Sequence, residues 1–135
     1  MNNGRFATAL HILTLLEIKK EELLSSEFIA NSINVNSAVV RKEIGNLRAH
    51  KFIESKEGKG GGYTLGKPAS QIHLSEVYKS VNETPLLGRS NDPNPDCPIG
   101  KQINGHLKEL FTAADETFLK QLGKITVRDF AKKFK

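Results

Sequence analysis

Cysteine is almost absent from this chain of 135 residues, and tryptophan is absent altogether. The single cysteine, Cys97, cannot form a disulfide within one chain and cannot supply the several thiolates of a cysteine-rich metal site. No apolar run approaches the ~18 residues of a membrane span, and residues 1–5 lack the apolar core of a signal peptide. These absences argue against disulfide-stabilised, secreted and membrane-spanning classes. They predict a cytoplasmic protein with no metal site of its own.

The net charge and the chain length further limit the classes of protein to which this chain can belong. The chain carries a formal net charge of +5. A basic excess of this size favours a polyanionic partner such as nucleic acid, although it is not specific evidence by itself. The length suits one compact domain, or a small domain with an added dimerisation segment, and an apolar content of 38% suffices for a modest core.

Hydrophobic periodicity organises the first 81 residues into helices and one hairpin. Val40, Ile44 and Leu47, for example, share one face of a helix, because they recur at the helical period. Two short strands that flank a glycine-rich turn containing Lys59 predict a β-hairpin with a flexible basic tip. The predicted helices cover residues 4–20, 26–33, 37–50 and 74–81, and the predicted strands cover 52–56 and 63–65.

The second half of the chain reads as a loop and a long helix. Residues 82–98 contain four of the five prolines, which predicts a loop. A long helix over 99–122 follows, and a short helix over 126–134 ends the chain. The apolar stripe of the long helix exceeds what one small domain needs, so we expect it to form a homodimer interface; packing of the stripe on the first helix alone is the alternative. The interface candidates are Ile103, Leu107, Leu110, Phe111, Ala114 and Phe118.

The order helix, short helix, turn, helix, hairpin is that of a winged helix-turn-helix. The predicted fold is therefore mainly α with a small β-hairpin wing and a long C-terminal dimerisation helix. We expect a DNA-binding domain over 1–81, a proline-rich loop over 82–98, and a dimerisation helix with a C-terminal helix over 99–135. In this fold the second helix of the motif enters the major groove of double-stranded DNA, where base edges carry a distinct pattern of donors and acceptors.

Polar and basic residues at the start of the helix over 37–50 are the candidate DNA readers. Arg41 could read guanine or bind a phosphate, and Val39 could contact a thymine methyl group. Asn36 could contact DNA or only cap the helix. Two lysines of the hairpin are candidates for phosphate contacts, because lysine supplies a flexible point charge. The candidates taken from this pattern are Asn36, Ser37, Val39, Arg41, Lys42, Lys56 and Lys59.

Several motifs of the chain resemble one family over almost the full length. The chain is similar to the Rrf-two family of bacterial winged helix-turn-helix transcription regulators, the family of IscR, NsrR and CymR, and to a YwnA-like subgroup of it. We add Arg5, Ser26 and Tyr63, which lie in these motifs, to the DNA-contacting candidates. The motifs cover residues 4–7, 26–30, 36–37, 39–42, 58–67, 72–78 and 94–101.

The resemblance implies a homodimer, joined through the long helix, that binds a palindromic operator and acts as a repressor. It also marks one departure. Members of the family that hold an iron–sulfur cluster use three clustered cysteines after the fourth helix, whereas this chain has only Cys97 there. Because such clusters need thiolate ligands, we expect no cluster and no other cofactor.

Cys97 supports a further hypothesis. It precedes a predicted helix start with Lys101 one turn on, and both a helix N-terminus and a cation favour thiolate. Cys97 is therefore a candidate thiol sensor whose oxidation alters DNA binding, with a thiol of no regulatory role as the alternative. Two other functions stay open: an interaction protein that kept the fold and lost DNA binding, and a thiol enzyme that uses Cys97. The main prediction is a regulator without enzymatic activity. The operator, the regulated genes, the inducing signal and any small effector do not follow from the sequence.

Overall fold

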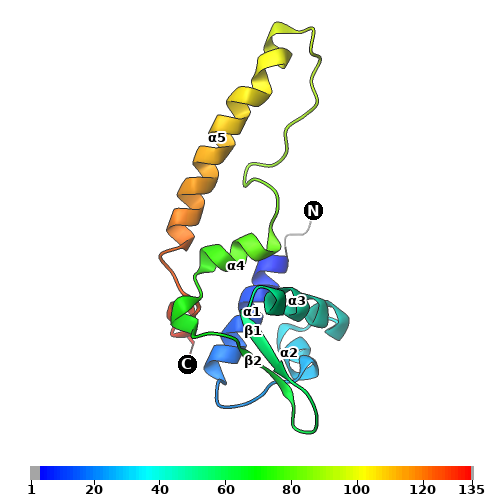
Figure 1. Ribbon diagram of the computed structural model, residues 1–135, viewed down its shortest axis with the longest axis vertical. Coiled ribbons are helices and arrows are strands. Elements are labelled where there is room, and N and C mark those ends of the chain that lie inside the picture. Colours follow the sequence, from blue (N-terminus) through cyan, green and yellow to red (C-terminus); the bar gives the residue numbers. More distant parts are fainter. Residues whose placement is uncertain (1–3, 135) are drawn as a thin grey trace.

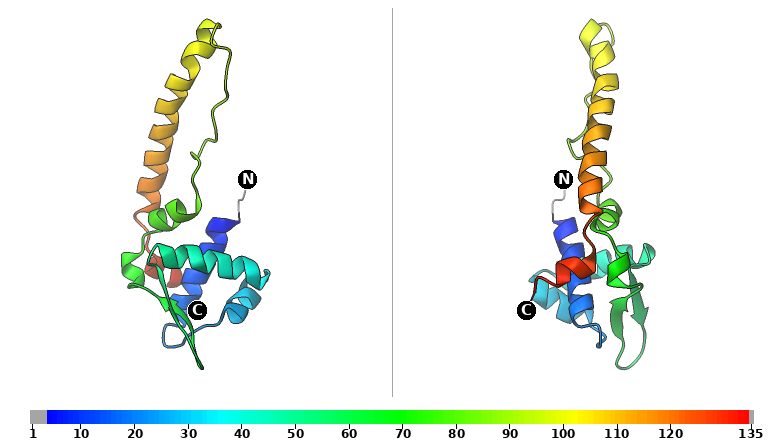
Figure 2. Two further views of the ribbon diagram at one scale, coloured as in Figure 1. Left: turned by 45° about the vertical axis from the view of Figure 1, so that its right-hand side comes forward. Right: turned by 90° about the vertical axis from the view of Figure 1, so that its left-hand side faces the viewer.

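The computed structural model describes residues 4–134 and shows a head of packed helices from which one long helix projects as an arm (Figure 1). The turned views in Figure 2 show that the arm is a single helix accompanied by an extended segment of chain. The elements in chain order are α1 (Arg5–Ile18), α2 (Ser26–Ile33), α3 (Ser37–Ala49), β1 (Ile53–Lys56), β2 (Gly62–Leu65), the 3-10 turn η1 (Ala69–Gln71), α4 (Leu74–Val81), α5 (Pro98–Leu122) and α6 (Val127–Ala131).

Local capping separates α2 from α3 and creates the turn between them. The Ser25 hydroxyl accepts a hydrogen bond from the Phe28 N–H at 3.1 Å and so starts α2. Asn34 closes α2 in the left-handed conformation, with φ of 62°. Asn36 then starts α3, because its Oδ1 accepts a hydrogen bond from the Ala38 N–H at 2.7 Å. The two helices are thereby held as a helix-turn-helix pair.

The wing is a two-stranded antiparallel hairpin. Ile53 lies opposite Leu65 at its base, and Lys56 lies opposite Gly62 near its tip. A bridge to the chain before α2 ties the wing to the head: Tyr63 donates its N–H to the Leu24 carbonyl at 2.8 Å, and Leu24 returns a bond of 3.1 Å. The wing therefore leaves the head in a defined direction.

Helix α1 runs through the core of the head, where Ile12 and Leu13 are fully buried. Helix α6 returns to this core after the arm, with Val127 fully buried. The return is held by backbone bonds from the Val127 N–H to the Ile72 carbonyl at 2.8 Å and from the Leu74 N–H to the Ile125 carbonyl at 2.9 Å. The C-terminal helix thus belongs to the head in space, although it follows the arm in sequence.

The arm contrasts with the head, because no residue of α5 is buried. Residues 82–97 run beside α5 in both figures, and hydrogen bonds of Leu86 and Asn91 attach the segment to the helix along its length. The Leu86 N–H donates to Asp115 Oδ1 at 2.8 Å, and Asn104 Nδ2 donates to the Asn91 carbonyl at 2.9 Å. Although α5 is 25 residues long, none of the described helices is apolar enough to cross a lipid bilayer.

The predicted fold class is confirmed: the chain is mainly helical, with a hairpin wing and a long C-terminal helix. The predicted helix over 26–33 is confirmed as α2, and those over 37–50 and 99–122 differ from α3 and α5 by one residue at one end. The helix predicted over 126–134 is shorter, because α6 ends at Ala131.

Candidate nucleic-acid interface

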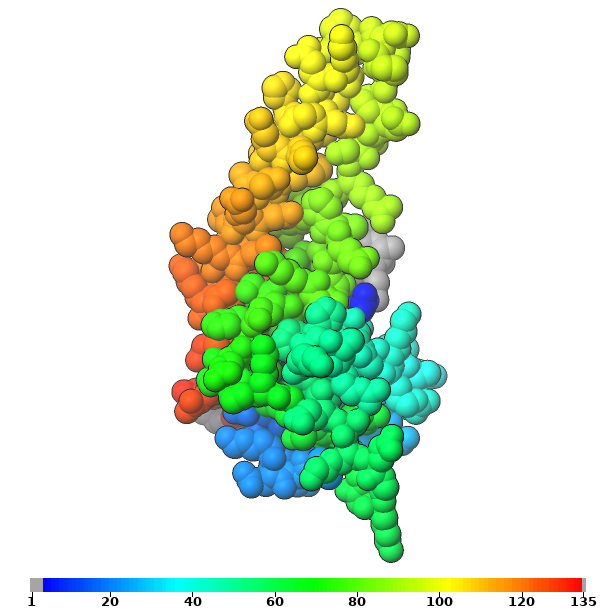
Figure 3. Space-filling model, viewed as in Figure 1, coloured from blue at the N-terminus to red at the C-terminus, as the bar shows by residue number. Residues whose placement is uncertain are grey.

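Helix α3 has one buried face and one open face. Val40, Ile44 and Leu47 are buried against the head, as their spacing predicts. The remaining surface of the helix is exposed, and Val39, at the flank of the buried stripe, keeps 51% of its surface accessible. Figure 3 shows the wing projecting at the end of the molecule opposite the arm, so the arm leaves the wing end of the head uncovered. The start of α3 therefore presents its side chains outward.

Arg41 is exposed on α3. Its Nη1 lies 3.3 Å from the Ser37 hydroxyl, one turn earlier, and 3.8 Å from a carboxylate oxygen of Glu27 in α2. About half of the Arg41 side chain and three quarters of the Glu27 side chain are exposed, so water screens this pair. Lys42 is exposed beside Arg41. The guanidinium is therefore positioned by weak contacts that DNA can replace.

Asn36 performs the capping role that the sequence allowed. Its Oδ1 is committed to the Ala38 N–H, while the side chain stays exposed. Capping occupies one acceptor of an amide that also has two donors, so capping and a DNA contact through the side-chain N–H groups are compatible.

The wing adds basic groups beside α3. Lys56 and Lys59 are exposed, whereas Tyr63 is half-buried where the wing joins the head. Arg48, in the last turn of α3, donates from Nη1 to the Ser55 hydroxyl of β1 at 2.9 Å. A shallow groove of about 260 Å³ lies between the start of α2 and the wing, lined by residues that include Arg48, Lys56 and Tyr63.

Arg48 is absent from the residues predicted from the sequence. Its signal was present, since it lies seven residues after Arg41 and so falls on the same face of the helix. What the sequence could not show is its bond to the wing, because Ser55 comes from a separate element.

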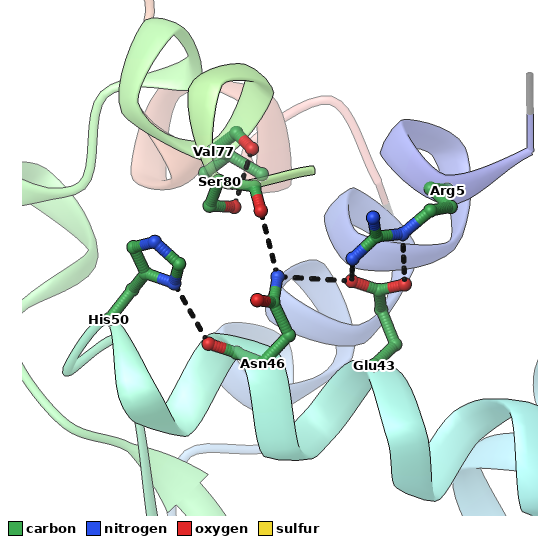
Figure 4. Close-up of polar contacts among 6 residues, drawn as sticks. All are labelled: Arg5, Glu43, Asn46, His50, Val77 and Ser80. Atoms are coloured by element: carbon green, nitrogen blue, oxygen red, sulfur yellow. Dashed lines mark hydrogen bonds and ion pairs between the residues drawn. The ribbon is translucent and has the colours of Figure 1, made fainter. Parts of the chain in front are cut away.

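Two predicted contact residues lie outside α3 and the wing, although Arg5 lines a groove together with Val39 and Lys42 of α3. Ser26 begins α2 and is buried, with 7% of its surface exposed, and Ser25 rather than Ser26 caps the helix. Arg5, at the start of α1, makes a two-pronged ion pair with Glu43: its Nε donates to Oε2 at 3.0 Å and its Nη2 to Oε1 at 3.1 Å (Figure 4). This hydrogen-bonded pairing with Glu43 raises the pKa of Arg5 above its usual value.

Glu43 and Asn46 are functional candidates that the sequence pattern missed. Glu43 lies on α3 beside the buried stripe, where an ionised carboxylate requires a partner. A carboxylate next to the apolar positions Val40 and Ile44 was therefore a usable signal. The identity of the partner was not readable, because Arg5 lies 38 positions away in the chain.

The arm presents the predicted dimer stripe to solvent. Ile99 is 72% exposed, Ile103 40% and Leu110 57%. Leu107, Phe111, Ala114 and Phe118 are half-buried. At the base of the arm, Phe118 packs edge-on against Tyr78 of α4, with ring centroids 4.9 Å apart. Nearer the start of α5, the exposed side chains of the stripe are not covered by the head.

Cys97 caps the start of α5. Figure 1 shows that α5 begins at the outer tip of the arm. Cys97 lies between the head and α5 in sequence, but the start of α5 that it caps is far from the head in space, because the chain runs up the arm before α5 begins. The thiol is exposed, and its Sγ accepts a hydrogen bond from the Gly100 N–H at 3.4 Å. Hydrogen bonds from the backbone of Gly100 and Ile99 lower the pKa of Cys97.

The donor groups of this chain do not fit an iron or iron–sulfur group. The sequence offers one thiolate, and no group of three or more His, Cys, Asp or Glu gathers within residues 4–134. An iron–sulfur cluster is held mainly by several cysteine thiolates.

Comparison with known proteins agrees with this geometry. The family model Rrf2, described as an iron-dependent transcriptional regulator, matches residues 2–133. The chain is 37% identical over 130 residues to the HTH-type transcriptional regulator YwnA of Bacillus subtilis (strain 168), covering 96% of each protein. A crystal structure of a transcriptional regulator from Lactobacillus plantarum has 25% identity and a TM-score of 0.78, covering 94% of this chain and 87% of that one.

CymR of B. subtilis, described as the global cysteine regulator, shares the fold: its structure has 20% identity and a TM-score of 0.75, covering 100% of this chain and 98% of that one. The family match over residues 2–133 and these structural similarities agree with the capped helix-turn-helix and its wing. The chain belongs to the Rrf2 family and is a DNA-binding transcription regulator with a winged helix-turn-helix.

Proposed function

We propose that this regulator acts as a homodimer, joined along α5, that represses transcription by covering a palindromic operator. The observation that carries the proposal is the unburied apolar stripe of the arm, where Ile99, Ile103 and Leu110 together expose a large apolar surface on one helix. Exposed apolar stripes of this kind mark interaction surfaces. A second copy supplies the same stripe by two-fold symmetry, and two-fold symmetry in the protein matches a palindrome in the DNA.

Within each head, the start of α3 reads bases and the wing holds the backbone. Val39, Arg41 and Lys42 are the proposed base and major-groove contacts, because they are exposed on the open face of α3. Lys56 and Lys59 are the proposed phosphate contacts from the wing, and Arg48 supports the junction between α3 and the wing through its bond to Ser55. Phosphate contacts make the affinity fall as salt rises.

The same proposal includes function in the cytoplasm, where bacterial DNA is found, without a cofactor or an enzymatic activity. The single thiol supports the proposal that no cluster is bound, since iron–sulfur clusters are held mainly by several cysteine thiolates. A thiol response through Cys97 is a second candidate function, favoured by its full exposure and by the lowered pKa of its thiol. A change at the arm tip would act on DNA binding through the dimer rather than through the head.

The decisive experiment is in vitro selection of duplexes from a random library by the purified protein at fixed salt, followed by light scattering of the free protein. We expect a palindromic motif to be enriched and the free protein to have the mass of a dimer. Failure to enrich any motif would favour the alternative of an interaction protein that lost DNA binding. A monomeric mass would refute the proposed homodimer.

Replacing Arg41 tests the assignment of the reading face. Arg41→Ala should weaken binding to the selected duplex by roughly 1–3 kcal/mol if the guanidinium contacts a base edge in a two-pronged manner. The matched control is Arg128→Ala, because Arg128 is an exposed arginine of α6 and carries the same charge. Fluorescence anisotropy at one salt concentration measures both. Equal affinities for the two variants would show that Arg41 does not contact the bases.

A further inference from the structure

Glu43 is the one charged residue among residues 4–134 that is buried, with 5% of its surface exposed. It lies on the recognition helix one turn after Val39, and its side chain points toward Arg5 at the start of α1 (Figure 4). Both carboxylate oxygens are bonded to Arg5, at 3.0 and 3.1 Å. A buried carboxylate with two-pronged pairing has one favourable geometry, because either oxygen would be left unsatisfied by a shift of the helix.

Asn46 extends this contact to a third helix. Its Nδ2 donates to Glu43 Oε1 at 3.3 Å and to the Ser80 carbonyl of α4 at 2.9 Å. An amide nitrogen has two hydrogens, so both donors are used. In the described part of the chain, this is the one hydrogen bond between α3 and α4 that involves a side chain of α3. Arg5, Glu43 and Asn46, which we call the clamp, therefore connect α1, α3 and α4.

Helix α4 is also where the head meets the arm. Tyr78 of α4 packs edge-on against Phe6 of α1, with centroids 5.8 Å apart, and against Phe118 of α5 at 4.9 Å. The chain leaves α4 at Asn82 to run up the arm. Any change in the angle between α3 and α4 would therefore change the angle between α3 and the arm.

We propose that the clamp is a positioning device that sets the orientation of α3 relative to the arm, and thereby the half-site spacing that the dimer accepts. This inference rests on the proposed dimer, because spacing has meaning only when two heads are joined. The apolar face of α3 holds the helix in the head but permits small rotations, since apolar contacts are not directional. The clamp adds the directional contacts. Glu43 and Asn46 act through α3 and need not touch DNA.

The test measures spacing preference rather than affinity. The probes are the duplex recovered by in vitro selection with the unmodified protein, and the same duplex with one base pair added or removed at its centre. One base pair rotates the two half-sites relative to each other by about a tenth of a turn. We expect the unmodified protein to bind the altered spacings about tenfold more weakly, comparable to the cost of a mismatched base pair.

Asn46→Asp is the informative variant. It has the size of Asn46, but it removes both donors and places a second carboxylate beside Glu43. We expect the tenfold preference to fall to about twofold while binding to the altered spacings is retained. The matched control is Gln71→Glu, an amide-to-carboxylate change at an exposed position of η1. Asn46→Ala serves as a milder second variant, and hydrogen exchange over residues 37–49 reports the mobility of α3 in both.

The outcomes separate the two proposals. A lost spacing preference with faster exchange in α3, in either Asn46 variant, supports the clamp. An unchanged preference in a folded variant overturns the clamp and leaves the regulator intact. A uniform loss of affinity for all three probes also overturns it, because it shows a merely structural role. If the unmodified protein selects no palindrome, the proposed dimeric function fails and the clamp fails with it.

Discussion

Glu43 and Arg41 lie two residues apart on one helix and have opposite surroundings. Arg41 is half exposed, and its contact with Glu27 at 3.8 Å is the kind of surface pair that contributes between zero and about 1 kcal/mol. Glu43 is buried and has a two-pronged partner at 3.0 and 3.1 Å. Because helical residues two apart face different directions, the Arg41 side chain lies in solvent while the Glu43 side chain packs against Arg5 of α1.

The Arg5–Glu43 pair makes a prediction about stability. Arg5→Gln should lower the free energy of unfolding by about 1–3 kcal/mol, because it leaves a buried carboxylate without its cation. The double variant Arg5→Gln with Glu43→Gln should recover part of this loss, since two amides can hydrogen-bond to each other. Urea unfolding at one protein concentration measures both variants and the single variant Glu43→Gln. A double variant that loses the sum of the two single effects would show that the side chains do not interact.

Cys97 makes a prediction about pH. Backbone hydrogen bonds from Gly100 and Ile99 lower the pKa of its thiol, so the reactive thiolate forms at lower pH in the folded protein than in the unfolded chain. As the pH is raised, the rate of alkylation by iodoacetamide should therefore begin to increase at a lower pH in the folded protein than in the unfolded chain. The same chain in urea is the control, and its one cysteine gives a single signal. Coincident pH profiles would contradict the lowered pKa.

At the scale of elements, the wing depends on a close approach between backbones. Gly62 begins β2 beside Leu24, and an added Cβ would lie 2.7 Å from the Leu24 carbonyl oxygen. That oxygen accepts the hydrogen bond of the Tyr63 N–H that attaches the wing to the head. A side chain at Gly62 must therefore push the wing away from Leu24.

Gly62→Ala should destabilise the protein by about 1–3 kcal/mol, the usual cost of overpacking, and should weaken DNA binding through a displaced wing. The matched control is Gly105→Ala in α5, where a Cβ meets nothing within 4 Å. There the same substitution should raise stability by up to about 1 kcal/mol, because alanine favours helix. Thermal unfolding compares the two. A loss of equal size at both glycines would refute the steric explanation.

At the scale of the whole molecule, the head and the arm are built differently. The head buries apolar residues from α1, α2, α3, α4 and α6, whereas α5 buries none. An apolar stripe left in water is costly, at roughly 25 cal/mol per Å² of exposed apolar surface. Association of two arms would remove this cost, and it would place one head at each side of a two-fold axis.

If the proposed dimer forms along α5, Leu110→Glu should convert it to a monomer, because the substitution places a charge within the apolar stripe. Sedimentation velocity measures the mass, and circular dichroism verifies that the helices remain. Lys108→Glu is the control, since Lys108 is exposed two residues away on the opposite side of α5. The variant should also bind the selected palindrome more weakly while single half-sites are bound as before. A Leu110→Glu protein that stays dimeric would move the interface away from α5.

Local signals made the elements predictable. Apolar residues at helical spacing, Ser25 and Asn36 as caps, and the glycines of the wing all act within a few residues, so α2, α3 and the hairpin could be placed from the sequence to within one or two residues. The family resemblance is confirmed by the match over residues 2–133. The individual DNA and dimer contacts stay predictions.

The amino-acid sequence alone determined the class of protein: a basic, mainly helical winged helix-turn-helix with an apolar arm, because composition, periodicity and capping are properties of neighbouring residues. Only the tertiary structure decided which distant groups meet. It paired Arg5 with Glu43, joined Leu24 to the wing, returned α6 to the head and carried Cys97 to the outer tip of the arm. Such contacts depend on how the helices pack in three dimensions, and the spacing of residues along the chain does not reveal which distant residues will meet.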